Sequence, residues 1–417
     1  MQIYLVGGAV RDKLLNLPVK DRDWVVVGAS PQQLLDQGFT QVGKDFPVFL
    51  HPETKEEYAL ARTERKQGRG YTGFECYAGE DVTLEADLQR RDLTINALAE
   101  NQDGNIIDPY GGQQDLQHKQ LRHVSPAFSE DPLRVLRVAR FLARYQPLGF
   151  TIAEETMALM KTMVAAGEVS DLTCERVWQE TERALLEKKP RAYFEALREC
   201  GALAVLFPDL DNLFGVPQPP QHHPEIDTGI HTLMVLDQAI NMSHNLSQDE
   251  QLQIRWAALT HDLGKGKTPP ETLPNHYGHE AISEYLTEKL SEQYRVPKQV
   301  TRMAKLVAYF HTHCHKAFEL KPATVMRLLE SLDAFRRPET LATFVITCEA
   351  DAKGRTGLED RDYPQADYLR DCLRAASQVQ AKEIIEQFDL RGEALGHELR
   401  RQRINAIRQV KKDYVSD

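Results

Sequence analysis

Residues 3–12 read IYLVGGAVRD, and residues 21–27 read DRDWVVV. The two apolar runs and the glycine pair predict a strand, a tight turn into a helix, and a second strand. Because residues i and i+2 of a strand point to the same face, Asp21 and Asp23 can hold one divalent cation between them. Backbone N–H groups of the glycine pair can approach a phosphate at the helix N-terminus. This stretch therefore predicts metal-dependent phosphoryl or nucleotidyl transfer.

A solvated surface loop is the competing interpretation, because a glycine pair after a strand is common and Asp-x-Asp alone is a weak signal. The glycine turn, Arg11-Asp12 and Asp-x-Asp all fall within the first 23 residues, and this order disfavours a plain loop. Arg11 also stands about one helical turn beyond the glycines, where its guanidinium can reach the same phosphate.

The composition is typical of a globular protein with more than one domain. The chain has 417 residues, of which 41% are hydrophobic and 27% charged. No segment approaches the roughly 18 apolar residues of a membrane helix, and the apolar start is too short for a signal peptide. The six cysteines are scattered without a C-x-x-C pair, which favours reduced thiols. We therefore expect a cytoplasmic protein without membrane contact.

A net charge of −11 argues against a generally basic nucleic-acid binder but allows local basic surfaces. Residues 134–144 place four arginines at spacings of three, three and four. Residues 398–412 carry six Lys or Arg and one acid. For this second segment a solvated helix face is as good an interpretation as RNA contact, unless other parts of the chain point to RNA.

The pattern along the chain changes from mixed to helical. β-rich runs and glycine turns predict an α+β head with a small mixed sheet, and residues 63–84 read as a long loop. From about residue 128 apolar residues recur every three or four positions, and prolines near 206–224 suggest a boundary. We expect an all-α neck, body and tail after the head. The four expected regions are 1–122 (head), 123–224 (neck and body), 225–355 (histidine-rich body) and 356–417 (tail).

Two further motifs carry arginines beside carboxylates. Residues 90–98 read RRDLTINAL, where two arginines open a short apolar helix and Asp92 can accept from a ribose hydroxyl. Residues 130–141 read EDPLRVLRVARF, which places Glu130 and Asp131 in a first helical turn. The competing interpretations are a helix with a charged first turn and an amphipathic core helix.

These motifs, with DPYGGQQDL at 108–116 and ERVWQE at 175–180, stand in a recognisable order. Residues 1 to about 185 resemble the class II tRNA nucleotidyltransferase and bacterial poly(A) polymerase family. The resemblance implies a five-stranded nucleotidyltransferase sheet followed by helical neck, body and tail domains. It also implies that Asp21 and Asp23 bind Mg²⁺, which activates an RNA 3′-hydroxyl and neutralises the triphosphate.

The resemblance further implies a set of nucleotide contacts. The expected nucleotide-binding residues are Gly8, Arg11, Arg91, Asp131, Arg134, Arg137 and Arg140. Asp131 and Arg134 match the positions that read the base edge, where a carboxylate and a guanidinium can match cytosine or adenine after small rotations. Glu57, on an expected strand, is a candidate third metal carboxylate, although an exposed glutamate is the simpler interpretation.

Ten of the fourteen histidines lie in residues 222–315, which chance explains poorly. His261-Asp262 ends an apolar helix, and this pair with spaced histidines and a distal aspartate favours a metal site. The block resembles the HD phosphohydrolase superfamily. By that resemblance the ligands are His231, His261, Asp262 and Asp351, and His279 and His311 contact a second metal or a phosphate. No role is assigned to His222, His223, His244, His276, His313 or His315.

Imidazole and carboxylate ligands suit a transition metal such as Ni²⁺, Co²⁺ or Mn²⁺, which makes a water nucleophilic near neutral pH. Lys265 can bind phosphate, with a plain surface lysine as the alternative.

A nucleotidyltransferase head followed by an HD body resembles the bacterial multifunctional CCA family. That family adds C, C and A to tRNA 3′ ends from CTP and ATP. Its HD domain acts as a phosphatase, 2′,3′-cyclic phosphodiesterase and 2′-nucleotidase in tRNA end repair. The resemblance implies tRNA, CTP and ATP as partners, and leaves monomer and homodimer both open. The alternatives are a poly(A) polymerase, which shares the head motifs, and a catalytically inactive nucleotide-binding regulator.

Overall fold

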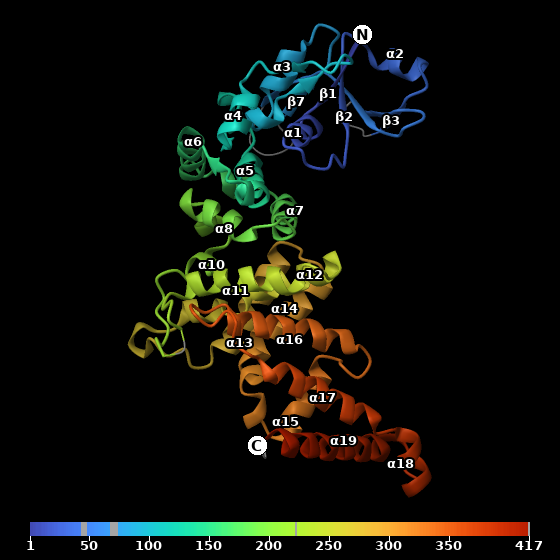
Figure 1. Ribbon diagram of the computed structural model, residues 1–417, viewed down its shortest axis with the longest axis vertical. Coiled ribbons are helices and arrows are strands. Elements are labelled where there is room, and N and C mark those ends of the chain that lie inside the picture. Colours follow the sequence, from blue (N-terminus) through green and yellow to red (C-terminus); the bar gives the residue numbers. More distant parts are fainter. Residues whose placement is uncertain (43–47, 67–73, 222, 416–417) are drawn as a thin grey trace. The chain divides into compact units, whose positions relative to one another are not determined.

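The computed structural model describes residues 1–42, 48–66, 74–221 and 223–415. The chain divides into two compact units, Met1–Leu206 and Phe207–Asp417. The first unit holds a sheet with covering helices, followed by more helices, and the second is helical (Figure 1). The predicted α+β head and all-α remainder are confirmed.

The head is built on one mixed sheet of seven strands in the order β3-β4-β5-β2-β1-β8-β9. The strands of this sheet are β1 (Gln2–Val6), β2 (Asp23–Val27), β3 (Thr40–Val42), β4 (Val48–Leu50), β5 (Glu57–Leu60), β8 (Ala99–Glu100) and β9 (Ile106–Ile107). The expectation of five strands is therefore wrong for the described residues. Strands β8 and β9 pair antiparallel beside β1, and two-residue strands are too short to leave an alternating pattern in the sequence.

The predicted strand, turn, helix and second strand are confirmed at the start of the chain. Gly7 caps α1 (Gly8–Leu14) with φ 67°, a backbone conformation that favours glycine. A Cβ on Gly7 would also lie 2.8 Å from Nη1 of Arg91. Strand β1 pairs antiparallel with β2, which puts Val6 opposite Asp23 at the end where α1 begins. Glycine is thus required here by its backbone angle and by a neighbouring side chain.

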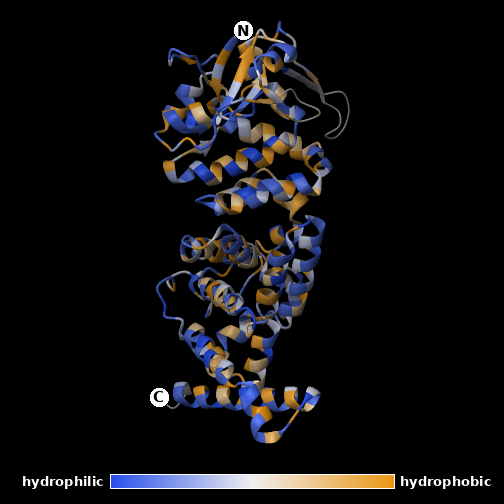
Figure 2. Cartoon of the chain, turned by 90° about the vertical axis from the view of Figure 1, so that its right-hand side faces the viewer, coloured by the Kyte–Doolittle hydropathy of each residue, from blue (hydrophilic) through white to orange (hydrophobic). Residues whose placement is uncertain are grey.

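Strand alternation divides the head core between the two faces of the sheet. Val25 packs in a cluster with Leu88 of α3 (Leu84–Gln89), whereas Val26 packs with Leu34 of α2 (Pro31–Asp36). Neighbouring residues of β2 therefore serve opposite faces, as the two-residue period of a strand requires. Figure 2 shows the hydrophobic colour along the head strands.

The expected loop at residues 63–84 is wrong over part of its length. β6 (Thr63–Lys66) and β7 (Phe74–Tyr77) pair antiparallel, with Thr63 opposite Tyr77. Long-range pairing of this kind is invisible to a local composition argument. Gly68, Gly70 and Gly73 of the expected loop lie outside the described residues.

Two expected helix starts are placed differently by the structure. Arg90 is the C-cap of α3, and only a single 3₁₀ turn, Thr94–Asn96, follows it, so the arginines end a helix rather than open one. Asp131 has extended angles (φ −120°, ψ 106°) and precedes α5 (Leu133–Tyr145). Its Oδ1 accepts from the N–H of Leu133 at 3.0 Å, so the side chain satisfies the helix end from outside.

The rest of the first unit is helical apart from one short strand pair. β10 (Gln120–Leu121) and β11 (Thr151–Ile152) pair in parallel. The remaining helices are α4 (Gly112–His118), α6 (Glu154–Ala165), α7 (Cys174–Leu185), α8 (Pro190–Glu199) and α9 (Ala202–Leu206).

The second unit is a helical array. Helix α11 packs against α12 and α16, and α12 also packs against α14. The helices are α10 (Pro208–Asp211), α11 (Thr228–Ser243), α12 (Gln248–Thr260), α13 (His279–Gln293), α14 (Lys298–His315), α15 (Pro322–Ser331), α16 (Pro338–Lys353), α17 (Pro364–Gln378), α18 (Ala381–Phe388) and α19 (Gly392–Val415). None of the helices in the described part of the chain has the length and apolar character to cross a membrane. All six cysteines are free thiols.

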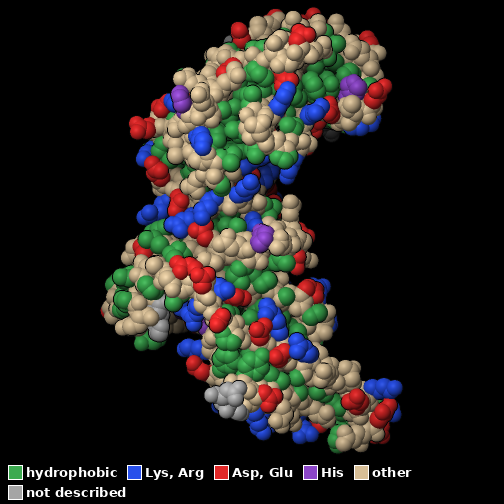
Figure 3. Space-filling view, in the orientation of Figure 1, with side chains coloured by type: hydrophobic (Ala, Val, Ile, Leu, Met, Phe, Trp, Pro, Cys, Tyr) green, Lys and Arg blue, Asp and Glu red, His purple; other side chains and the backbone are tan. Residues whose placement is uncertain are grey.

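Several basic residues of the C-terminal helix α19 are engaged within the chain. Arg400 pairs with Glu330 at 2.9 Å, and Arg401 pairs with Glu398 at 2.6 Å. Arg403 lies over the ring of Phe335. Red and blue side chains are interspersed over this end of the molecule (Figure 3). RNA contact by residues 398–412 therefore stays a prediction.

Candidate active sites

A cavity of about 690 Å³ in the first unit collects the residues that the motifs singled out. All nine predicted head residues line it: Gly8, Arg11, Asp21, Asp23, Arg91, Asp131, Arg134, Arg137 and Arg140. Sequence reasoning assigned no role to five further lining arginines, namely Arg62, Arg90, Arg144, Arg176 and Arg183. Among the described residues, ten arginines and four aspartates line the cavity, so it is cationic although the chain is acidic.

The two carboxylates of the opening motif face this cavity together. Asp23 begins β2, but Asp21 lies before the strand, so the expectation that the strand opens with both carboxylates is wrong for Asp21. Burial raises the pKa of Asp23 above its usual value, the charge of Arg91 opposes this rise, and neighbouring Asp21 adds to it. Two adjacent carboxylates repel each other, and a bound cation relieves that repulsion. Oxygen donors of this kind suit Mg²⁺, so the residues fit the expected metal.

Glu57 stands opposite Asp23 in the parallel pairing of β2 with β5. It is exposed and is not among the residues that line the cavity. Its assignment as a third carboxylate stays a prediction.

Arg11 is held in place by a buried network. Its Nε donates to Asp12 at 2.9 Å, and its Nη1 donates to Asn96 at 2.5 Å. Asp12 also accepts from the hydroxyl of Tyr145 and from Arg144. The side chain of Arg11 is only 4% exposed, so the orientation of its guanidinium is set before any anion arrives.

The carboxylate of Asp87 fixes Arg90 and Arg91 at 2.9 and 3.2 Å. Asp92 accepts from Arg137 at 2.7 Å and from Asn96 at 2.9 Å. Burial opposes ionisation of Asp92, but Arg137, Asn96 and Arg134 together outweigh it and hold the pKa of Asp92 well below the usual range. Asp92 thus orients arginine and asparagine side chains, and its expected ribose contact stays a prediction.

The predicted base readers are also held by neighbours. Asp131 accepts from Nη2 of Arg176 at 2.9 Å. Arg134 donates to the carbonyls of Ala127 and Arg90 at 2.7 and 2.5 Å. Main-chain carbonyls therefore set the plane of the Arg134 guanidinium, and this plane fixes the direction of its remaining N–H donors.

A second cluster forms in the second unit, where helices α11, α12, α13, α14 and α16 supply or flank its residues. His261 and Asp262 directly follow α12. Gly264 lets the start of α13 approach, because a Cβ there would lie 2.3 Å from the carbonyl oxygen of His279. Close packing of this turn brings His279 beside Asp262.

The ligand candidates fall into two groups that share a neighbourhood. One group is His231, His261 and Asp351, and the other is Asp262, His279 and His311; ligand atoms within each lie within 4.8 Å of one another. The structure thus brings together all six residues expected from the HD resemblance.

Asp262 reaches toward both groups. Its Oδ2 is 3.1 Å from Nε2 of His261, and its Oδ1 is 3.3 Å from Nε2 of His279. Nevertheless, His261 Nε2 and Asp262 Oδ1 are buried without an aligned hydrogen-bond partner among the described residues. Buried polar atoms are rarely left in this state, so they fit a divalent cation.

The tautomers of three candidate ligand histidines are set by main-chain carbonyl groups three or four residues earlier in the chain. Nδ1 of His261 lies 2.8 Å from the carbonyl oxygen of Ala258, and Nδ1 of His279 lies 2.7 Å from the carbonyl oxygen of His276. Nδ1 of His311 lies 3.1 Å from the carbonyl of Val307. A carbonyl only accepts, so each Nδ1 carries a proton, and in the neutral rings Nε2 keeps a lone pair toward the carboxylates.

Burial and neighbouring charges shift the pKa values of the side chains in this cluster. Burial lowers the pKa of His311 to about 3, so this ring is neutral near pH 7. Burial also opposes charge on Asp262, but His261, Lys265 and His279 together outweigh it and hold the pKa of Asp262 well below its usual value. The cluster therefore offers an ionised carboxylate and a neutral imidazole, the forms that bind metals.

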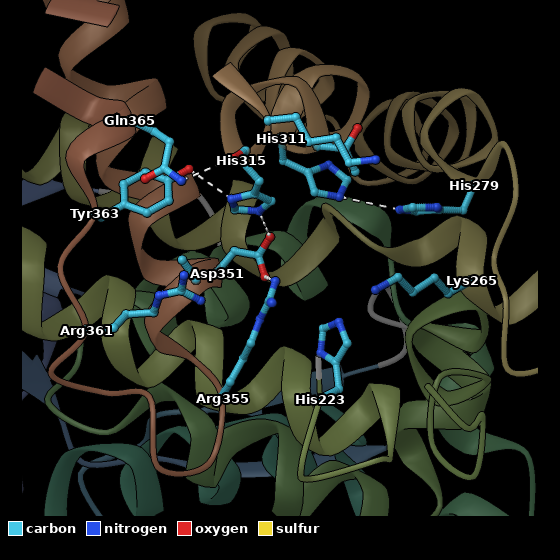
Figure 4. A pocket seen from close by; sticks show the side chains of 13 residues that line it. His223, Lys265, His279, His311, His315, Asp351, Arg355, Arg361, Tyr363 and Gln365 are labelled. Atoms are coloured by element: carbon cyan, nitrogen blue, oxygen red, sulfur yellow. Dashed lines mark hydrogen bonds and ion pairs between the residues drawn. The ribbon is translucent and has the colours of Figure 1, made fainter. Parts of the chain in front are cut away.

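A pocket of about 420 Å³ opens over the cluster (Figure 4). Nζ of Lys265 lies 2.6 Å from Oδ2 of Asp262, and Lys265 is buried, so the surface-lysine interpretation is wrong. Nε2 of His315 lies 2.6 Å from Oδ2 of Asp351. Arg355 and Arg361 line the same pocket and add positive charge suited to a phosphate. Sequence reasoning missed both arginines because nothing in the local pattern marks them.

The other histidines separate by environment. His223 lines the pocket, and burial lowers its pKa to about 4. His276 bonds Thr268 and the carbonyl of Pro217, whereas His244 is exposed. His313 has a buried Nδ1 without a partner among the described residues. His222 lies outside the described residues.

Three families match successive parts of the chain. The Poly A polymerase head domain matches residues 3–122, and the HD domain matches residues 228–352. Residues 149–214 match the family described as "Probable RNA and SrmB- binding site of polymerase A". The head-domain match contains Asp21, Asp23, Arg11 and Arg91, and the HD-domain match contains all six metal-ligand candidates of the second cluster.

Solved structures share the fold. A CCA-adding enzyme in apo form II has a TM-score of 0.67 at 18% identity, with 100% of this chain and 91% of the other covered. The Thermotoga maritima CCA-adding enzyme complexed with tRNA has a TM-score of 0.62 at 19% identity, with 99% and 91% covered. At these identities the comparison supports the fold.

Curated relatives resemble the chain much more closely. The Multifunctional CCA protein of Hahella chejuensis is 58% identical over 413 residues, which cover 99% of this chain and 96% of the relative. The protein of the same name from Thioalkalivibrio sulfidiphilus is 58% identical, with 99% and 100% covered. With near-complete coverage at this identity, the chain belongs to the multifunctional CCA protein family.

Proposed function

We propose that this enzyme adds C, C and A to tRNA 3′ ends from CTP and ATP, and hydrolyses phosphate esters at RNA ends in its HD domain. The observation that carries the first activity is the cationic head cavity with Asp21 and Asp23 on its wall. The proposed regions are a head (1–122), a neck and body (123–224), an HD domain (225–355) and a tRNA-contacting tail (356–417).

Charge complementarity supports a nucleoside triphosphate in the head cavity. Asp21 and Asp23 would hold Mg²⁺, which when bound supplies Lewis-acid stabilisation of the triphosphate. Arg11 and Arg91 would bind triphosphate oxygens, since both line the cavity beside the glycine turn. Arg11 is already oriented by Asp12 and Asn96, so binding costs little further ordering.

Base selection would rest on Asp131 and Arg134, with Arg137 and Arg140 as further nucleotide contacts. A carboxylate accepts from an exocyclic amine, and a guanidinium donates to ring nitrogen or carbonyl acceptors. The carbonyls of Ala127 and Arg90 hold the plane of the Arg134 guanidinium, so only a few orientations of a base can form hydrogen bonds with it. No nucleic-acid template is needed in this arrangement.

Replacing Arg134 with alanine is expected to erode nucleotide selection more than it slows addition. One good bidentate contact discriminates by about 1–3 kcal/mol, so the preference for CTP over UTP should fall roughly 5- to 150-fold. The kcat/KM values for both nucleotides on tRNA lacking CCA measure this ratio. An unchanged ratio in R134A would exclude Arg134 as a base reader.

The test of the nucleotidyl transfer proposal uses the wild-type protein, tRNA lacking CCA, and CTP, ATP or both. Sequencing of the added ends should show C-C with CTP alone and C-C-A with both. A homopolymeric A tail on any RNA would indicate a poly(A) polymerase instead. An unextended tRNA would indicate an inactive nucleotide-binding protein.

The second activity is carried by the HD cluster beneath the cationic pocket. His231, His261, Asp262 and Asp351, with His279 and His311, would hold one or two transition-metal ions such as Ni²⁺, Co²⁺ or Mn²⁺. Such an ion, when bound, supplies Lewis-acid activation for phosphate ester hydrolysis. Lys265, Arg355 and Arg361 would bind the phosphate of the substrate. The proposed substrates are phosphate monoesters and 2′,3′-cyclic phosphates at tRNA ends.

Chelation is expected to remove both activities, and different ions should restore them. Oxygen ligands at Asp21 and Asp23 favour Mg²⁺, whereas imidazole ligands of the HD cluster favour Ni²⁺, Co²⁺ or Mn²⁺. After dialysis against EDTA, Mg²⁺ should restore CCA addition and a transition metal should restore hydrolysis of a 2′,3′-cyclic nucleotide. Hydrolysis that survives chelation would contradict the metal assignment.

A further inference from the structure

Glu225 is a buried carboxylate that reaches a metal-ligand candidate from behind. It lies in the loop between α10 and α11, and its side chain is 2% exposed. Its Oε1 lies 3.0 Å from Nδ1 of His231 and 3.0 Å from Nδ1 of His223. Nε2 of the same His231 ring lies 3.1 Å from Oδ1 of Asp351. The imidazole of His231 therefore stands between Glu225 and the metal cluster.

The loop is shaped to turn Glu225 inward. The N–H of Gln218 donates to the carbonyl of Ile226 at 2.7 Å, and Asp227 caps the start of α11. Ile226 has φ 62°, an outlier for a β-branched residue, and its apolar side chain is 47% exposed. An unfavourable backbone and an exposed isoleucine persist only where surrounding contacts impose them. Both are consistent with a loop selected for the position of the neighbouring carboxylate.

His223, Glu225 and His231 do not form a metal site of their own through Nδ1 of His231. That nitrogen also lies 2.9 Å from the carbonyl of Gly354, and neither this carbonyl nor the ionised carboxylate can donate. Nδ1 of His231 must therefore carry the proton. Its Nε2 is left to face the cluster, which is the nitrogen that a metal at His261 and Asp351 would use.

We propose that Glu225 is a positioning residue that, together with the carbonyl of Gly354, holds the tautomer and ring orientation of His231, and that its charge strengthens Nε2 as a metal ligand. The other ligand histidines present Nδ1 to main-chain carbonyls. His231 is the one among the described ligand candidates whose Nδ1 meets a carboxylate within hydrogen-bond distance. A carboxylate behind a ligating imidazole raises its basicity, and loss of such a partner weakens metal binding about 10- to 100-fold. The inference rests on the proposed phosphohydrolase function.

The experiment titrates Ni²⁺ into the full-length, metal-stripped protein in excess Mg²⁺, which occupies the head carboxylates. Glu225→Ala should raise the Ni²⁺ Kd about 10- to 100-fold. Glu225→Gln keeps an acceptor without the charge and should fall between wild type and Glu225→Ala. Glu280→Gln is the matched control, because its carboxylate lies 3.6 Å from Nδ1 of His279, beyond hydrogen-bond distance, whereas Glu225 lies 3.0 Å from Nδ1 of His231. Its Kd should match that of the wild type.

A spectroscopic readout separates positioning from general destabilisation. In Zn²⁺-loaded, ¹⁵N-histidine-labelled protein, the Nδ1–H proton of His231 should resonate downfield, because it faces the charged carboxylate of Glu225 as well as the carbonyl of Gly354. It should move upfield in Glu225→Ala and partly so in Glu225→Gln. Thermal melting checks that each variant is folded. If Glu225→Ala does not fold, the Ni²⁺ Kd and the Nδ1–H resonance of Glu225→Gln test the proposal.

The outcomes distinguish the two levels of the proposal. A wild-type protein that binds no Ni²⁺ would overturn the metal-dependent phosphohydrolase itself. Wild-type binding together with a folded Glu225 variant of unchanged Kd and unchanged Nδ1–H resonance would overturn the role of Glu225 alone.

Discussion

Replacing Asp21 and Asp23 together with alanine is expected to lower CMP and AMP incorporation into tRNA lacking CCA by at least about a thousandfold. Both carboxylates face the head cavity, and their removal deletes the oxygen ligands proposed for Mg²⁺. Metal ions stabilise phosphoryl transfer by several kcal/mol, and about 1.36 kcal/mol corresponds to tenfold in rate. Single-turnover assays with radiolabelled CTP and ATP measure the loss directly.

The matched control for this double variant is Asp36→Ala. Asp36 is an exposed carboxylate on α2 of the same unit and does not line the cavity. Its replacement should leave incorporation unchanged, and phosphatase activity should survive in both proteins. Asp23→Asn, which keeps the shape of the side chain, should lose nearly as much incorporation as Asp23→Ala. Undiminished incorporation in the double variant would refute the assignment.

Replacing His261 with alanine is expected to reduce phosphate ester hydrolysis by about a thousandfold or more, again from the loss of several kcal/mol of metal stabilisation. Nε2 of His261 lies 3.1 Å from Asp262 and 3.8 Å from Asp351, and it has no aligned hydrogen-bond partner. Its loss removes a ligand and leaves two buried carboxylates with less compensation. Hydrolysis of a 2′,3′-cyclic nucleotide measures the effect, and CCA addition should be largely intact.

His244→Ala provides the comparison for a histidine of the same unit. His244 caps the C-terminal end of α11, the helix that carries His231, but it is exposed. Its replacement should change neither activity. Equal loss of hydrolysis and CCA addition in His261→Ala would identify His261 as a structural residue rather than a ligand.

Local patterns predicted a large part of both clusters. The glycine turn was predictable because Gly7 must take a positive φ, and the Asp-x-Asp pair was visible because it stands at the start of an apolar strand. The His-Asp pair was visible because it ends an apolar helix, α12. In each case the chemistry-bearing residues are near neighbours in sequence, where spacing alone limits their geometry.

Helix boundaries around the arginine motifs were less predictable. The side chain of Asp131 caps α5 from outside the helix, whereas its sequence context equally suits a first-turn acid. Arg90 is the C-cap of α3 and Arg91 follows it, and Asp87 on that helix pairs with both. Propensity describes single residues, but these boundaries depend on which partner each side chain finds.

By itself the sequence predicted the α+β head and the helical remainder, and its family resemblances supplied the six HD ligand candidates and most of the nine predicted residues that line the head cavity. Only the tertiary structure decided the supporting contacts. Examples are the hydrogen bond from Arg176 to Asp131, 45 residues apart, and the one between His231 and the carbonyl of Gly354, 123 residues apart. The tertiary structure also decided that Lys265 is buried against Asp262 and that Glu225 lies behind His231. The physical reason is that a motif constrains only the geometry of its own few residues. The groups that orient its side chains and shift their charge states lie on segments distant in sequence, which tertiary packing brings close.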